Sequence, residues 1–205
     1  MKSNVCKIKD GTKDLDMILK ECEKVAVYNE LTHKQSLQLR LICEEIDGML
    51  PNIIDEFNGN FWIDFEDGVC RVNLSIKFDE FTAEKKKGLV ALSKNKKNAA
   101  AVGIVGKIRS ALENVFLDSD VLSSSGIMFE SQYYSPDYHM AMDRNYGRDY
   151  SSFWSLEKYR GSVKDGYDAD SWDELEKSVL ASVADDVVVG VKGKQADIIV
   201  IKKFN

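Results

Sequence analysis

Two alternating runs joined by an Asp-Gly pair constrain the fold of this 205-residue chain more than any other feature. In residues 61–66 and 69–78, apolar side chains recur at every second position, which is the period of a β-strand. The Asp67-Gly68 pair between them is typical of the tight turn of a β-hairpin. The sequence therefore predicts an antiparallel hairpin with one apolar face, which a second layer must cover.

Residues 32–55 carry the clearest helical period, and we expect them to supply that layer. Thr32 is the predicted N-cap, and Gly48 with Pro51 marks where the helix weakens and ends. The apolar side chains recur at three- and four-residue steps, which places them on one stripe of the helix: Leu39, Ile42, Ile46, Met49 and Ile53.

Further elements complete one predicted domain over residues 1–205. A strand at residues 5–9 and a helix at residues 15–31 precede the central helix. Near the other end, a helix begins with a capping box at Ser171, and two strands flank a turn at Gly193-Lys194. These elements predict an α/β (α+β) two-layer sandwich, in which a mixed, mostly antiparallel sheet of four or five strands carries helices on one face.

Charge and composition limit the partners and the cellular compartment that we expect for this chain. The net charge of −6 argues against a broad phosphate-binding surface, so nucleic acid is not an expected partner. No run approaches the roughly 18 apolar residues of a membrane span, and the first ten residues lack the apolar core of a signal peptide, so we expect a cytoplasmic protein. The four cysteines form no C-x-x-C pair and are interpreted as reduced, mostly buried thiols: Cys6, Cys22, Cys43 and Cys70.

Residues 119–166 are rich in Tyr, Ser, Asp and Gly, and we interpret them as an insertion into the domain. Their aromatic content is too high for plain disorder. The favoured interpretation is a segment that packs on the body, because aromatic side chains bury their area on any available surface. The alternative is a lid or docking surface, where Tyr and Trp are common anchors. The aromatic side chains are Tyr133, Tyr134, Tyr138, Tyr146, Tyr150, Phe153, Trp154 and Tyr159.

Glu45 is the first candidate site residue. It lies beside Ile42 and Met49 on the helical wheel, so its carboxylate is expected at the edge of the buried stripe. A carboxylate in that position needs a partner or a chemical role. The structural explanation is that the carboxylate pairs with a lysine or accepts a hydrogen bond from a backbone N–H. The functional explanation is that it belongs to a binding or catalytic site.

A second set of candidates follows the hairpin. Asp79 comes just after the second strand, and Gly103 and Gly106 stand in a small-residue stretch before a periodic helix that carries Lys107. Free N–H groups at a helix start, with glycines that leave room and a lysine close by, suit a phosphate group. The same pattern also serves as a flexible, closely packed helix entry.

Together these residues resemble the ATPase domain of the gyrase, chaperone and histidine-kinase superfamily, with the closest likeness to small bacterial anti-sigma regulatory ATPases. The resemblance covers residues 34–116 and the last strands. It implies a Bergerat-type fold that binds ATP between the central helix and a mobile lid. It also implies that Glu45 is the acid of the N box, that Asp79 reads adenine, and that Gly103, Gly106 and Lys107 wrap the phosphates.

The chain departs from this family at two motifs. The family has an Asn one turn after its N-box Glu to hold magnesium, whereas Met49 follows Glu45 here and offers no oxygen ligand, which argues against bound Mg²⁺. The family's strand-end motif is Asp-x-Gly-x-Gly, and residues 79–83 contain no glycine. Bulky side chains at the second motif would obstruct the approach of adenine to the backbone, whereas the loss of the Asn should reduce turnover far more than it changes the shape of the site.

Two functions are expected from these observations. The first is an ATP-binding regulatory protein with weak or no catalysis, in which Glu45 would be the general base of any ATPase or protein-kinase reaction. Its expected partners are a purine nucleotide and a protein, including a second copy of the chain. The alternative is a degenerate copy of the fold that binds no nucleotide and acts as a protein-interaction module through residues 119–166.

A third interpretation, an unrelated metal enzyme, uses Glu44 with Glu45 and Asp185 with Asp186. It is weaker, because neighbouring acids on a helix point about 100° apart and rarely share one site.

Overall fold

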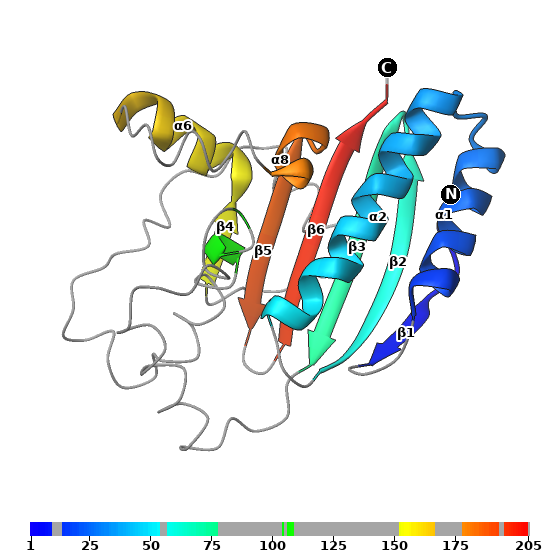
Figure 1. The fold of residues 1–205 in the computed structure, drawn as a ribbon, viewed down its shortest axis with the longest axis horizontal. Helices are drawn as coiled ribbons and strands as arrows, with labels where there is room; N and C mark the ends of the chain where they lie inside the picture. The colour runs from blue at the N-terminus through cyan, green and yellow to red at the C-terminus, as the bar shows by residue number, and fades with distance from the viewer. Residues whose placement is uncertain are drawn as a thin grey trace.

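The computed structural model describes residues 1–9, 14–53, 57–77, 104, 106–108, 152–166, 178–192 and 195–204. These residues form two layers, a sheet and a set of helices on one of its faces (Figure 1). The predicted α/β sandwich is therefore confirmed. The strands are arranged in the order β1-β2-β3-β6-β5-β4, and every described pairing is antiparallel.

The central hairpin forms where the alternating runs predicted it. β2 (Asn58–Glu66) and β3 (Val69–Lys77) pair in full register across the two-residue turn. Asp67 and Gly68 both have positive φ, 51° and 75°, which is the geometry of a type I′ turn. Its twist matches that of the flanking strands, so the Asp-Gly pair fixes the register of the hairpin.

The helical layer begins with α1 (Leu15–Tyr28), which follows the edge strand β1 (Cys6–Lys9). α2 (His33–Ile53) is capped as predicted, because the Oγ1 of Thr32 accepts from the N–H of Gln35 at 3.4 Å and the Gln35 side chain accepts from the N–H of Thr32 at 2.9 Å. α2 continues through Gly48 and Pro51 before it ends.

The C-terminal hairpin is also confirmed, as β5 (Asp186–Lys192) and β6 (Gln195–Lys203), and β6 lies next to β3. Before it, α8 (Val179–Val183) is capped by Ser178. Ser171, the predicted start of this helix, lies outside the described residues.

The sheet gains a strand that the sequence did not predict. β4 (Ser152–Ser155) comes from the aromatic-rich segment, pairs with β5 and leads into α6 (Leu156–Gly166). The carboxylate of Asp186 accepts from the N–H of Glu157 at 2.9 Å, and the Arg160 guanidinium donates to the carbonyls of Asp185 and Ala184 at 2.9 and 3.3 Å. The end of that segment is therefore built into the sheet and the helical layer.

The core lies between the sheet and helices α1 and α2. All four cysteines are free and buried, as predicted. No described helix has the length and apolar composition needed to cross a membrane. Among the most fully buried side chains are Ile18, Leu39, Ile42, Ile46, Phe61, Leu74 and Ile198.

Candidate functional site

Glu45 lies on the flank of α2 that faces away from α1. The opposite flank is marked by Arg40, 3.8 Å from Glu23 of α1, and by Cys43, which lies in the same buried core as Cys22 of α1. Glu45 follows Cys43 by two residues, about 200° around the helix axis. α2 lies between α1 and α8 (Figure 1). Helix geometry therefore places Glu45 on the flank of α2 nearer to α8.

Glu45 as a residue is partly buried, and within the described part of the chain no hydrogen bond or ion pair reaches its carboxylate. Its neighbour Glu44 differs, because the Arg40 Nε lies 2.9 Å from the Glu44 Oε1. Removing a carboxylate from water without a partner costs free energy. Glu45 shares this situation with Asp47, a second partly buried acid of α2 without a partner among the described residues, whose pKa is raised by burial.

The structure describes only some of the other candidate site residues. β3 ends at Lys77, at the end of the sheet where α2 also ends (Figure 1). Asp79 and Gly103 lie outside the described residues. Gly106 is helical and buried, and Lys107 beside it is helical and half-buried.

Lys107 contacts the ring of Tyr159, a residue that the sequence did not connect with it. Its Nζ lies 5.1 Å from the ring centroid of Tyr159, in the arrangement of a cation–π contact. The ring of Trp154 in β4 lies 6.2 Å from that of Tyr159. The Tyr159 hydroxyl is buried and has no hydrogen-bond partner in the structure as described. No short-range pattern links Lys107 to residues so far along the chain.

Polar side chains gather on the face of the sheet opposite to the helices. Asp64 accepts hydrogen bonds from the Trp62 indole at 2.9 Å and from the Asn73 amide at 3.1 Å. Asn73 is only 1% exposed, so this network satisfies polar groups that would otherwise be costly to bury. The alternation of residues 61–66 and 69–78 predicts that these side chains share a face, but not that they are buried.

A second network continues along the same face. The Gln195 amide donates to the Ser75 hydroxyl and to Asp197, both at 2.8 Å, and Asp197 is 3% exposed. Because these groups bind one another across β3 and β6, we interpret them as a structural network.

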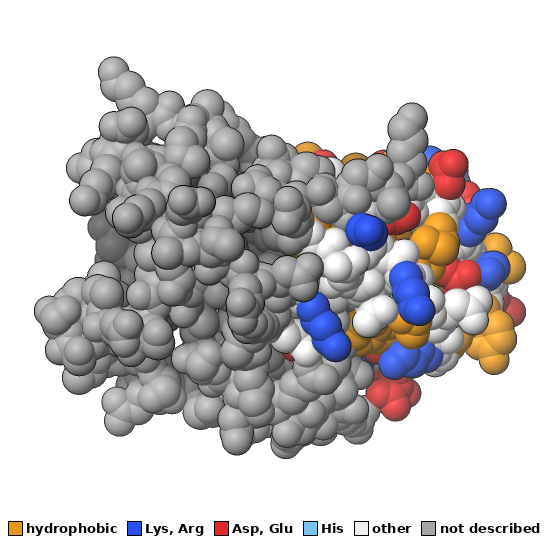
Figure 2. Space-filling model, turned by 90° about the horizontal axis from the view of Figure 1, so that it is seen from below, with side chains coloured by type: hydrophobic (Ala, Val, Ile, Leu, Met, Phe, Trp, Pro, Cys, Tyr) orange, Lys and Arg blue, Asp and Glu red, His pale blue; other side chains and the backbone are white. Residues whose placement is uncertain are grey.

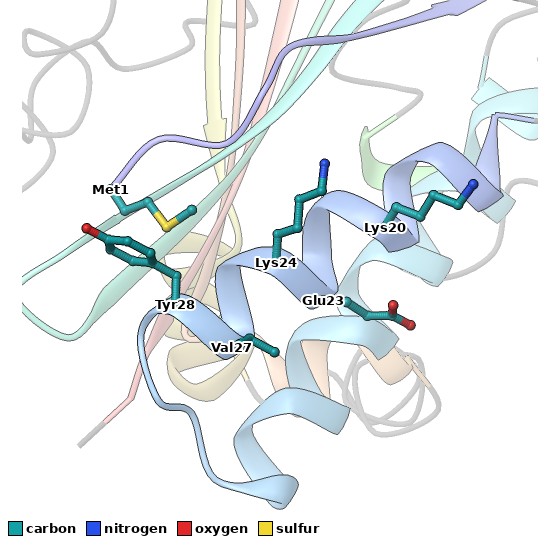
Figure 3. Close-up of a pocket in the computed structure, with 6 residues that line it drawn as sticks. All are labelled: Met1, Lys20, Glu23, Lys24, Val27 and Tyr28. Atoms are coloured by element: carbon teal, nitrogen blue, oxygen red, sulfur yellow. The ribbon is translucent and has the colours of Figure 1, made fainter.

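A shallow groove of about 540 Å³ runs along the outer side of α1 (Figure 3). Its lining combines apolar and charged side chains: Met1, Lys20, Glu23, Lys24, Val27 and Tyr28. Figure 2 shows that basic and acidic side chains are interspersed over the described part of the lower end of the molecule.

The acids of the metal-enzyme interpretation are not assembled into one site. Glu44 binds Arg40, Asp185 accepts from the N–H of Lys203 at 2.6 Å, and Asp186 caps α6. Within the described ranges, no group of His, Cys, Asp and Glu is arranged to hold a metal ion.

Neither a family model, nor a curated protein, nor a solved structure matches this chain. Fold and site therefore define it only as an α/β two-layer protein, with a half-buried acid in the middle of its central helix.

Proposed function

We propose that this chain is a cytoplasmic, ATP-binding regulatory protein of the histidine-kinase-like type, with weak or no catalytic activity. The observation that supports it most is Glu45, a partly buried acid whose carboxylate lacks a partner within the described residues. A cytoplasmic location fits the four free cysteines, because thiols are kept reduced in that compartment.

The order of the elements is compatible with the proposal. The helix that carries Glu45 is followed by the β2-β3 hairpin, then by Lys107, and finally by the β5-β6 hairpin. Since α2 and β3 end at the same end of the sheet, a ligand there would be within reach of both elements (Figure 1).

The chemistry favours binding over turnover. A lysine such as Lys107 neutralises phosphate charge, and its contact with Tyr159 gives the ammonium a defined position. Met49, one turn after Glu45, is buried in the core and supplies no oxygen for magnesium. Glu45 would act as general base only if a water or hydroxyl group were positioned beside the terminal phosphate.

A thermal-shift titration tests this function. ATP, ADP and AMP are added to the full chain, each with and without magnesium. At ten times its Kd, a ligand that binds only the native state adds about 1.4 kcal/mol, which raises the Tm of a chain of this size by about 3–6 °C. We expect a shift with ATP and ADP that depends little on magnesium. A flat response to all three nucleotides at millimolar concentration would remove the proposal.

The variant Asp79→Asn sharpens the test, because it replaces the acid expected to read adenine. It should abolish the shift, whereas Glu44→Gln, on the same helix as Glu45 but paired with Arg40, should retain it. If Asp79→Asn responds to ATP like the wild type, nucleotide binding does not follow the proposed pattern.

A further inference from the structure

Two polar groups from distant parts of the chain meet at the ring of Tyr159 without the partners that burial normally requires. The Tyr159 hydroxyl is buried and has no hydrogen-bond partner among the described residues. The Lys107 ammonium lies 5.1 Å from the centroid of the same ring, and no described carboxylate pairs with it. Buried polar groups are nearly always hydrogen-bonded, and lysines are seldom removed from water unless they are paired. Both groups therefore point to a partner that the described part of the chain does not supply.

Two neighbouring polar side chains of α6 do have partners. The Ser162 hydroxyl donates to the Tyr159 carbonyl oxygen at 2.8 Å. The Arg160 guanidinium donates to the carbonyl oxygens of Asp185 and Ala184 at 2.9 and 3.3 Å. The Tyr159 hydroxyl thus differs from its neighbours on the same helix, and the charge of Arg160 is already used by the fold.

The side chains that carry the two groups are held in place and are partly accessible. The Trp154 ring lies 6.2 Å from the Tyr159 ring at an interplanar angle of 41°, and this packing limits the movement of the tyrosine. Tyr159 and Lys107 are each only partly buried as residues, whereas the hydroxyl oxygen itself is covered. A ligand that satisfies both groups must therefore be small.

We propose that the Lys107 ammonium and the Tyr159 hydroxyl together bind one phosphate group. An ammonium only donates hydrogen bonds, and a phenol hydroxyl can donate one, so the pair suits a ligand that offers negative charge and several acceptor oxygens. Pyrophosphate and the phosphate chain of a nucleotide both have this chemistry. Where the phosphate belongs to ATP, the assignment rests on the proposed function and adds Tyr159 to its site; where the phosphate is inorganic, the assignment stands alone.

Isothermal titration calorimetry of the full chain at constant ionic strength tests the proposal. The probes are sodium pyrophosphate and ATP, and sodium acetate is the control for an anion of another class. We expect the wild type to bind pyrophosphate and ATP with a Kd below about 1 mM and not to bind acetate. Equal binding of acetate and pyrophosphate would overturn the proposal, because the site would then not recognise phosphate.

Variants locate the contact. Tyr159→Phe removes only the hydroxyl and keeps the ring that Lys107 contacts, so it should weaken pyrophosphate binding about tenfold. Lys107→Met removes the charge and should weaken it by at least about tenfold. The controls Tyr28→Phe and Lys164→Met change an exposed tyrosine and an exposed lysine, and both should bind like the wild type. Without ligand, Tyr159→Phe should not lower the Tm, because the hydroxyl has no described hydrogen bond to lose; a clear fall would contradict the proposal.

The results also separate this site from the proposed nucleotide function. Pyrophosphate binding that Tyr159→Phe weakens supports the phosphate site, and if ATP does not bind, only the nucleotide function is removed. ATP binding that Tyr159→Phe and Lys107→Met leave unchanged would overturn the phosphate site while the nucleotide function is retained. Binding of neither pyrophosphate nor ATP to the wild type would overturn both.

Discussion

The carboxylate of Glu21 accepts hydrogen bonds from the backbone N–H of Asn4 at 3.0 Å and from its side-chain amide at 3.1 Å. Lys24, one turn further along α1, lies 2.5 Å from the same carboxylate. Glu21 is 6% exposed, so these donors satisfy a charge that is almost entirely removed from water. The contact joins the N-terminal strand segment to α1 and thereby fixes one edge of the two-layer fold.

Replacement of Glu21 should destabilise the fold. Glu21→Ala removes the charged acceptor of the hydrogen bonds from Asn4 and Lys24, and we expect the free energy of unfolding to fall by about 2 kcal/mol. Glu23→Ala on the same helix removes an exposed carboxylate and should change it by less than about 0.5 kcal/mol. Guanidinium unfolding followed by circular dichroism measures both. Equal effects would mean that the Asn4 contact contributes no stability.

The same contact predicts a pH dependence. Burial alone would raise the pKa of Glu21, but hydrogen bonds from Lys24 and Asn4, with the charge of Lys24, lower the pKa below its usual value. The stabilisation is therefore complete above the unfolded pKa of about 4.3 and is lost as the pH falls through the folded pKa. The stability difference between wild type and Glu21→Gln should shrink below about pH 4 in urea titrations. A constant difference would contradict this linkage.

The glycines of the turn and of α2 should respond in opposite directions. Gly68 has a φ of +75°, and a Cβ there would lie 3.0 Å from the Phe204 carbonyl oxygen, so Gly68→Ala should destabilise by about 1 kcal/mol. Gly48 lies inside α2 with open space at its Cβ position, so Gly48→Ala should stabilise by up to about 1 kcal/mol. Denaturant midpoints of the two variants compare them directly.

Glu45 and Glu44 offer a matched pair for separating a site acid from a structural one. Glu45→Gln removes the charge of a partly buried residue that has no partner among the described residues, so it should raise the free energy of unfolding by about 0.5 kcal/mol. Glu44→Gln breaks the ion pair with Arg40 and should lower it by a similar amount. A loss of stability in Glu45→Gln would indicate that the carboxylate has a structural role instead.

Local sequence patterns were sufficient to predict most of the two-layer fold. The type I′ turn at Asp67-Gly68, the capping of α2 by Thr32 and the C-terminal hairpin each depend on residues a few positions apart. β4 was not predicted, because four residues without a flanking turn signal become a strand only when the edge of β5 pairs with them.

Local sequence patterns predicted only part of the candidate site. The boundary position of Glu45 followed from its place on the helical wheel, and the partial burial of the residue agrees with it. The contact of Lys107 with Tyr159 joins residues from distant segments, and the burial of Asn73 depends on the tertiary surroundings of its strand. Such relationships come from tertiary packing, which periodicity and turn chemistry do not encode.

The most direct test of the central claim is a ¹H–¹⁵N NMR titration of the full chain with ATP. We expect the amide shifts to change along residues 42–49 of α2 and at the end of β3 near Lys77, while those of residues 20–28 in α1 stay unchanged. No shift change at millimolar ATP, or changes confined to residues remote from α2 and β3, would contradict this claim.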